Sequence, residues 1–219
     1  MSAAIFTRRQ LLAQGAASLG LDLSGTMLES LAAYVDLLVK WNRVYNLTAI
    51  RDPDEMLTQH LLDSLSVVNC LKVQRVLDVG SGPGLPGIVI SLVRPDLRVS
   101  LLDSNQKKCA FMQQAVSELR IANAQVECCR VENLATRQSD PGVFDSITSR
   151  AFASLADFAS ASLRYLAPGG RLVAMKGKVP EDELHDLPDT VRLIEIRPLQ
   201  VPGLTAARCA VILECISRD

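Results

Sequence analysis

The 219-residue sequence has few of the side chains that bind metals or transfer protons. It contains only two histidines, and none of its six cysteines forms a Cys-x-x-Cys pair, so no zinc or iron–sulfur site is expected. The cysteines are instead expected to be reduced thiols that pack as small apolar side chains, which indicates the cytoplasm.

Long apolar runs and linker-like segments are also missing. The first ten residues have no apolar stretch after their charges, and no run reaches the ~20 residues that a membrane helix needs. The sequence therefore predicts a soluble, cytoplasmic protein with no membrane partner. Without a glycine- or serine-rich linker, residues 1–70 and 71–219 are expected to pack as one unit, and the chain is expected to be a monomer.

Neither sign of charge is in excess. The chain has 23 basic and 24 acidic residues, for a formal net charge of −1. A near-neutral chain is not a general polyanion binder, so DNA is not an expected partner, and any RNA contact must come from a local basic face. With 48% hydrophobic and 21% charged residues, the chain is expected to be folded rather than disordered.

The most informative stretch is the glycine-rich segment 75–87, which reads RVLDVGSGPGLPG. It begins with a short apolar run typical of a buried strand, and glycines follow at 80, 82, 84 and 87. An apolar, helix-length segment over 88–93 ends before Pro95. Strand, glycine turn and helix predict the first half of a nucleotide-type βαβ unit, in which glycine lets a ligand approach the backbone.

Two classes of ligand fit such a turn by count. Residues 82–87 match G-x-G-x-x-G, and Asp103 lies 21 residues after Gly82, so the spacing allows a dinucleotide and an NAD-type oxidoreductase. A pyrophosphate, however, needs free backbone N–H groups at a helix N-terminus, and Pro83 and Pro86 each remove one.

The alternative ligand is S-adenosylmethionine, which carries no phosphate. Its sulfonium and ammonium groups are positive, and its ribose hydroxyls donate hydrogen bonds to carboxylates. Asp78 is expected to place a negative charge at the mouth of the turn that contains Gly82. Asp103 is expected to bind the ribose, although its position also suits a helix N-cap. These features favour S-adenosylmethionine over NAD.

From residue 75 onward, strand and helix patterns alternate. The predicted strands cover 75–79, 98–103, 125–128, 143–149, 171–176, 191–197 and 209–216, and the predicted helices cover 86–93, 105–120, 155–166 and 181–187. This alternation predicts an α/β fold with a mostly parallel sheet and helices on both faces. The last two strands have no helix between them, so one is expected to be antiparallel, which is the layout of class I methyltransferases.

The segment before the first strand has a different pattern. Residues 5–70 show helical periodicity, and Asp52-Pro53 is an N-cap followed by a proline at the first helical position. A sharp turn is expected at the Pro-Gly-Gly of 168–170. The fold class is therefore a Rossmann-like methyltransferase domain over 71–219 with an N-terminal helical cap over 1–70.

Further candidate ligand contacts lie in the glycine turn and after the third strand. Leu85 would cover the methionine portion of the donor or belong to the core. Glu132, with Val131, would flank the adenine or be a surface acid. In an open α/β sheet the ligand lies at the carboxyl ends of the strands, which is where these residues are placed.

Six fragments together resemble the bacterial RsmG/GidB family, the 16S ribosomal RNA guanine-N7 methyltransferases. They are WNRVYNLTAIRDPDEMLTQHLLDSLSV (41–67), LDVGSGPGLPGI (77–88), LLDSNQKK (101–108), CRVENL (129–134), FDSITSRAFASL (144–155) and MKGKVPEDEL (175–184). The resemblance runs in order over nearly the whole chain. Two departures, the Asn105-Gln106 pair before Lys107 and a less basic C-terminal strand region, concern RNA contact rather than donor binding.

The resemblance implies S-adenosylmethionine as methyl donor and 16S rRNA of the small ribosomal subunit as partner, with guanine 527 as the family's target. It places the donor contacts on Gly80, Leu85, Val131, Glu132 and Arg150, with Asp103 at the ribose. No catalytic residue is assigned, because guanine N7 has a free lone pair and no proton to remove, so positioning supplies much of the rate. A non-catalytic ribosome-binding protein remains the other alternative.

Contacts with unpaired RNA need aromatic and basic side chains. The candidates are Lys176, expected at the end of the fifth strand, and Phe152, together with Lys107 and Arg43. Trp41 and Tyr45 are further candidates for stacking, of which Trp41 is expected to be core. His60 is expected to be a packed, hydrogen-bonded residue rather than an RNA contact.

Overall fold

The computed structural model describes residues 3–72, 74–134 and 144–216. Its centre is one seven-stranded sheet in the order β3-β2-β1-β4-β5-β7-β6. The strands are β1 (Arg75–Val79), β2 (Arg98–Asp103), β3 (Ala124–Cys128), β4 (Phe144–Arg150), β5 (Leu166–Lys176), β6 (Val191–Pro198) and β7 (Cys209–Cys215). The first five are parallel, and β7 is antiparallel to both β5 and β6. The predicted fold class is therefore confirmed, and the antiparallel strand lies inside the sheet rather than at its edge.

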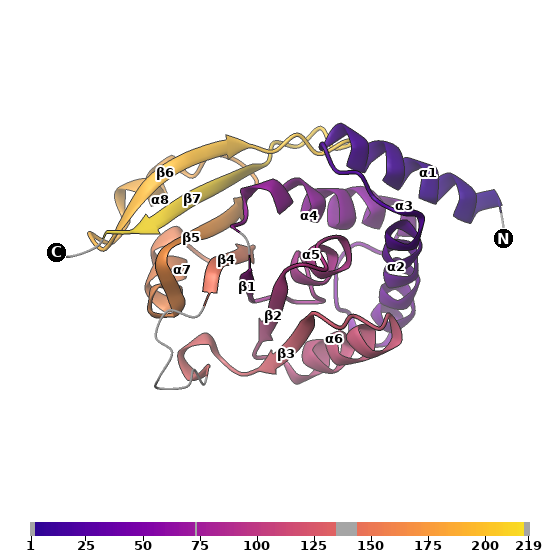
Figure 1. The fold of residues 1–219 in the computed structure, drawn as a ribbon, viewed down its shortest axis with the longest axis horizontal. Helices are drawn as coiled ribbons and strands as arrows, with labels where there is room; N and C mark the ends of the chain where they lie inside the picture. The colour runs from indigo at the N-terminus through magenta and orange to yellow at the C-terminus, as the bar shows by residue number, and fades with distance from the viewer. Residues whose placement is uncertain (1–2, 73, 135–143, 217–219) are drawn as a thin grey trace.

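Helices cover both faces of this sheet (Figure 1). In the sheet domain they are α5 (Gly87–Val93), α6 (Gln106–Glu118), α7 (Leu155–Ser162) and α8 (Glu181–His185), with 3₁₀ turns η3 (Val131–Asn133) and η4 (Leu163–Tyr165). Asn105 caps α6 by accepting from the N–H groups of Lys107 and Lys108. The helix predicted over 155–166 is α-helical only as far as Ser162 and continues as the 3₁₀ turn η4. The predicted turn at 168–170 is wrong: these residues lie within β5, where its register with β4 shifts.

The cap consists of helices that pack against one face of the sheet. They are α1 (Ala3–Ser18), α2 (Gly25–Tyr45), α3 (Pro53–Met56), the π-helical η1 (Leu57–Leu62), α4 (Asp63–Ser66) and the 3₁₀ turn η2 (Val68–Cys70). Asp52 caps α3 and Pro53 is its first residue, as predicted. One cluster of buried apolar residues joins the cap to α5, α6 and the β6–β7 loop. The cap and the sheet domain therefore share one buried cluster, and the boundary at residue 70 stays a prediction.

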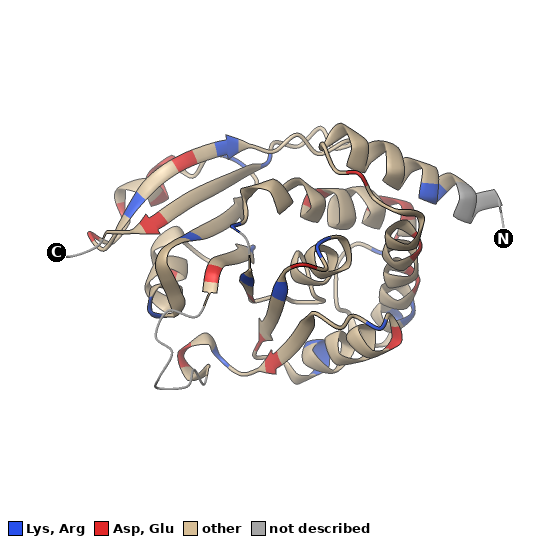
Figure 2. Ribbon diagram, in the orientation of Figure 1, with Lys and Arg blue, Asp and Glu red and all other residues tan. Residues whose placement is uncertain are grey.

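A second apolar cluster lies on the other face, under α7. Residues of β1 alternate between the two, with Val76 in the first cluster and Leu77 and Val79 in the second, because successive side chains of a strand point to opposite faces. Figure 2 shows basic and acidic residues dispersed over the cap and the sheet domain, in line with the near-zero net charge.

Candidate functional site

Every backbone N–H group of the glycine turn after β1, residues 80–87, donates a hydrogen bond to another group of the protein. Gly80 and Ser81 donate to the carbonyl of Leu102, Gly84 and Leu85 donate to the carbonyl of Ser81, and Gly82 donates to Asp103 Oδ2 at 2.9 Å. Gly87 donates to Asp78 Oδ2 at 2.9 Å, and the two remaining positions are prolines. The turn therefore has no free amide with which to bind a pyrophosphate, which supports the argument made from the prolines.

The glycines of this turn serve two different purposes. Gly80 and Gly82 have φ of +71° and +61°, and a Cβ on either would meet nothing closer than 3.9 Å, so open space lies in front of their backbone. A Cβ on Gly84 would lie 2.3 Å from Ile88, and one on Gly87 would lie 2.2 Å from Leu101. The first pair leaves a cradle that a ligand can enter, whereas the second pair lets α5 pack closely on the sheet.

Asp78 does not lie where the sequence predicted. It is fully buried beneath the turn, with one carboxylate oxygen bonded to Gly87 and the other without a hydrogen-bond partner. Burial raises the pKa of Asp78 to about 7, against the lowering effect of the Gly87 N–H. Asp78 therefore lies beneath the turn rather than at its mouth, its burial favours the neutral form, and its role in donor binding stays a prediction.

Asp103 joins the turn to the end of β2. Its Oδ1 accepts from the N–H of Asn105 at 2.8 Å and its Oδ2 accepts from Gly82, while Lys108 Nζ lies 3.8 Å away. The N-cap of α6 is Asn105, so the alternative role considered for Asp103 is filled by its neighbour. Each carboxylate oxygen keeps a further lone pair for a ribose hydroxyl.

The other predicted donor contacts fall in different environments. Leu85 is buried in the core cluster beneath the cap, and Val131 is buried in the second cluster. Glu132 is exposed, and its carbonyl accepts from Arg164. The roles of these three residues in donor binding stay predictions.

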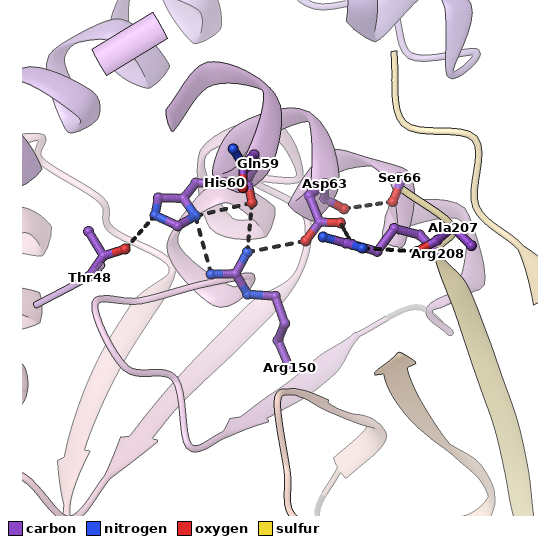
Figure 3. Close-up of polar contacts among 8 residues, drawn as sticks. All are labelled: Thr48, Gln59, His60, Asp63, Ser66, Arg150, Ala207 and Arg208. Atoms are coloured by element: carbon purple, nitrogen blue, oxygen red, sulfur yellow. Dashed lines mark hydrogen bonds and ion pairs between the residues drawn. The ribbon is translucent and has the colours of Figure 1, made fainter. Parts of the chain in front are cut away.

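Arg150 ends β4, next to the strand that carries the glycine turn, and it contacts the cap. Its Nη1 donates to the carbonyl of Gln59 at 3.0 Å and to Asp63 Oδ2 at 3.1 Å (Figure 3). Asp63 is buried and also accepts from Arg208 Nε at 3.0 Å, so one carboxylate holds two arginines. We call Asp63, Arg150 and Arg208 the carboxylate clamp.

The clamp depends on an unusual helical segment. Leu57–Leu62 is π-helical, a form that is rare and frequent at functional sites, and it contains the Gln59 carbonyl that accepts from Arg150. Ala151, directly after Arg150, has φ +66°, a left-handed conformation that costs a non-glycine residue about 1 kcal/mol. Sequence reasoning missed Asp63 and Arg208, although a carboxylate three residues after His60 on an apolar helix was a signal that could have been used.

His60 is buried, as predicted. Its Nε2 bonds Thr48 Oγ1 at 2.9 Å, and its Nδ1 lies 3.1 Å from the Gln59 carbonyl and 3.4 Å from Arg150 Nη2 (Figure 3). Burial, with a smaller contribution from the Arg150 charge, lowers the pKa of His60 to about 4. The imidazole is therefore neutral at physiological pH.

The clamp borders a cavity of about 400 Å³ between the cap and the carboxyl ends of β4 and β5. Its lining consists of Ile50, Gln59, His60, Asp63, Arg150, Ala151, Met175, Lys176, Gly177 and Arg208. This volume falls within the range of small-molecule pockets. Because Ser149 Oγ bonds the carbonyl of Val79 at 2.7 Å, the cavity and the glycine turn are adjacent along the sheet edge.

The four predicted RNA contacts are placed as follows. Lys176 lines the cavity but pairs with Glu183 at 2.8 Å, and its side chain is only 13% exposed. Phe152 is half-buried with its ring centroid 5.6 Å from that of Phe158. Lys107 and Arg43 are exposed. All four remain predictions.

Within residues 3–72, 74–134 and 144–216, no cluster of three or more potential metal ligands occurs. In the same part of the chain, no helix is both long enough and apolar enough to span a membrane.

A family model described as GidB, rRNA small subunit methyltransferase G, matches residues 27–212. The chain belongs to this family. The ribosomal RNA small subunit methyltransferase G of Neisseria meningitidis serogroup B is 48% identical over 207 residues, covering 94% of this chain and 98% of the relative. That of Burkholderia multivorans is 51% identical over 202 residues, covering 91% and 89%. The predicted family is confirmed, and it is one of small-subunit rRNA methyltransferases.

Solved structures agree in fold with this GidB-family chain. A SAM-dependent methyltransferase from Aquifex aeolicus aligns with a TM-score of 0.56 at 18% identity, covering 75% of this chain and 94% of that one. TrmN from Thermus thermophilus aligns with a TM-score of 0.54 at 19% identity, covering 73% and 53%. These likenesses show the class I fold, and together with the family they support S-adenosylmethionine as the methyl donor.

Proposed function

We propose that this protein transfers the methyl group of S-adenosylmethionine to N7 of one guanine of 16S rRNA, guanine 527 in the family. Family membership shows an rRNA methyltransferase. The side chains of the site support N7 as the atom that is methylated. The observation that carries the proposal is that the two side chains by the cavity that could remove a proton, Asp63 and His60, are both already hydrogen-bonded. Asp63 accepts from two arginines, and His60 is bonded to Thr48 beside a cationic guanidinium.

A site without a free base suits N7 and disfavours other acceptors. Methylation of an exocyclic amine or a hydroxyl requires removal of a proton, whereas the N7 lone pair of guanine attacks directly. S-adenosylmethionine supplies an electrophilic methyl group. The contribution of the protein is then to hold the acceptor in line with that methyl group, which reduces the entropic part of the barrier.

The residues of the turn fit the donor. The open side of Gly80 and Gly82 leaves room for the nucleoside against the backbone, and Asp103 has lone pairs for ribose hydroxyls. No amide of the turn is available for a phosphate, which argues against the NAD-type alternative. Arg150 would contact the donor from the side of β4, held there by Asp63 and the Gln59 carbonyl.

The adjacent cavity suits the acceptor base. Guanine O6 accepts hydrogen bonds next to N7, and an arginine that donates to O6 would orient the base while leaving the N7 lone pair free to attack. Arg150 and Arg208 line the cavity, and Asp63 is its one carboxylate.

The test is methylation of 16S rRNA and of small subunits taken from cells without this protein. Nucleoside mass spectrometry should find 7-methylguanosine, and strand cleavage at that base should map it to one position. RNA carrying 7-deazaguanosine at the mapped position should bind and remain unmethylated. Methylation of the deaza substrate would refute N7 as the acceptor, and an inactive protein that still binds subunits would favour the non-catalytic alternative.

A further inference from the structure

Three aromatic rings form a continuous path from the core to the surface at the end of α2. Phe111 on α6 is fully buried, and its ring centroid lies 5.7 Å from that of Trp41 with an interplanar angle of 62°. Trp41 is half-buried, and its ring lies 5.3 Å from that of Tyr45 at 33°. Tyr45, the last residue of α2, is 43% exposed. We call these three residues the aromatic path.

The exposed end of the path combines a supported aromatic ring with a second exposed apolar side chain. An exposed aromatic ring without packing neighbours is free to change its rotamer. A ring that packs against a second ring, which itself packs against a third, is held in one orientation. Val44, beside Tyr45, is 70% exposed. The surface therefore presents a fixed, partly apolar platform that no described part of the chain covers.

The platform belongs to one segment that contains no acidic residues, and the aromatic path runs from it into a second such segment. Residues 37–51 include Lys40, Arg43 and Arg51 and no aspartate or glutamate. Residues 104–117, which contain Phe111, include Lys107 and Lys108 and again no acid. Figure 2 shows acidic residues on many other parts of the fold. This local positive charge selects a polyanion over an apolar protein segment as the occupant.

A short segment connects the platform to the cavity. Asn42 fixes residues 46–51 by bonding the N–H of Thr48 at 2.9 Å and the carbonyl of Ile50 at 3.2 Å. Thr48 bonds His60, and Ile50 lines the cavity. Only residues 46–49 therefore separate Tyr45 in the chain from Ile50, which lines the cavity.

We propose that the Tyr45 ring stacks on an unpaired base of the rRNA segment that carries the target guanine. This inference rests on the proposed function and adds to it a second base-binding position outside the cavity. Single-stranded nucleic acids are bound by a cationic surface together with aromatic rings, and this combination occurs here. The platform would hold the strand next to the target while the target base occupies the cavity.

The experiment uses the single tryptophan of the chain as a reporter. Trp41 lies against Tyr45, so a base stacked on the platform should quench its fluorescence. The probes are short oligoadenylate and small subunits lacking the modification. Tyr45→Ala should weaken binding of both about 5- to 150-fold, which is the ~1–3 kcal/mol per stacked base converted at ~1.4 kcal/mol per tenfold.

Two matched variants separate stacking from packing. Tyr45→Phe keeps the ring and should bind like the parent, whereas Tyr45→Leu keeps apolar bulk over Trp41 without a π-face and should behave like Tyr45→Ala. Affinity for S-adenosylmethionine and the thermal midpoint should stay unchanged in all three. If Tyr45→Leu or Tyr45→Ala binds both probes and methylates subunits with the parent's KM, the platform is refuted. If the parent itself fails to methylate rRNA, the proposed function fails instead.

Discussion

The carboxylate clamp makes a sharp prediction, because one buried group holds two charges that come from distant parts of the chain. Asp63→Asn keeps the shape of the side chain and removes its charge, leaving Arg150 and Arg208 without an anionic partner. Asp63 is 3% exposed, and the two arginine side chains are 22% and 25% exposed. Removing one partner of a fully buried ion pair costs ~3–5 kcal/mol.

Here the cost is smaller, since each arginine keeps about a quarter of its side chain in water. We expect Asp63→Asn to lower the free energy of unfolding by about 2–3 kcal/mol, measured by urea denaturation at neutral pH. It should also weaken S-adenosylmethionine binding, measured by calorimetry, because Arg150 is no longer held in the position from which it is proposed to contact the donor. The matched control is Asp96→Asn, the same chemical change in the exposed pair with Arg94, which should cost at most ~1 kcal/mol.

A double-mutant cycle then tests whether the clamp acts as a unit. Arg208→Gln in the Asp63→Asn background should cost less than Arg208→Gln alone, because its partner is already gone. If Asp63→Asn lowers stability by no more than Asp96→Asn and leaves donor affinity intact, the reasoning is wrong, and Arg150 is positioned by the Gln59 carbonyl and local packing alone.

Three further predictions follow from the site. Gly82→Ala should weaken donor binding with a stability loss of about 1 kcal/mol from its positive φ, whereas Gly87→Ala should destabilise the fold more strongly; calorimetry and thermal melts distinguish them. The depressed pKa of His60 reduces stability as pH falls from 6.5 to about 4, and the raised pKa of Asp78 reduces it as pH rises from 3.8 to about 7, so the two oppose each other. His60→Gln should therefore lower, and Asp78→Asn should raise, the slope of stability against pH between 4 and 6.5, each by about 1.4 kcal/mol per pH unit, in urea titrations. Lys176→Ala should weaken rRNA binding and leave donor binding unchanged, and equal methylation rates for variant and parent would contradict its role.

The pH prediction has its own internal check. Groups that titrate elsewhere contribute equally to the parent and to each variant, so only the difference in slope is compared. Parallel stability curves for the parent and Asp78→Asn would mean that the buried carboxyl group does not have the raised pKa that its burial implies.

Much of the sheet followed from local pattern. The predicted strands overlap all seven observed strands. The inner strands are mostly buried, which leaves little choice of side chain, whereas the edge strands β3 and β6 are largely half-buried or exposed. Asp52-Pro53 also marked a helix start correctly, since both capping and φ are local properties. The Pro-Gly-Gly of 168–170 was misread because the same residues suit a turn and a bulged strand.

The parts of the site that were missed depend on contacts between distant residues. Asp63 and Arg208 are 145 positions apart, and only the closed fold brings them together. The side of the turn on which Asp78 lies was equally invisible, because the sequence gives the order of the glycines and not the direction in which the chain folds back. Two contacts between the cap and the turn show the same limit. Leu85 is buried in the core cluster beneath the cap, and the Tyr34 hydroxyl donates to the carbonyl of Pro83 at 2.7 Å.

The backbone N–H groups of the glycine turn are hydrogen-bonded without any ligand, and this has a consequence for turnover. A cradle already complete before any nucleoside arrives needs no ordering step, so its shape is the same for the spent donor as for the fresh one. The predicted partner of Asp103 is a ribose, which the reaction leaves unchanged. The demethylated product should therefore remain a strong competitor, and its departure, rather than the methyl transfer itself, is a natural candidate for the slow event in each cycle.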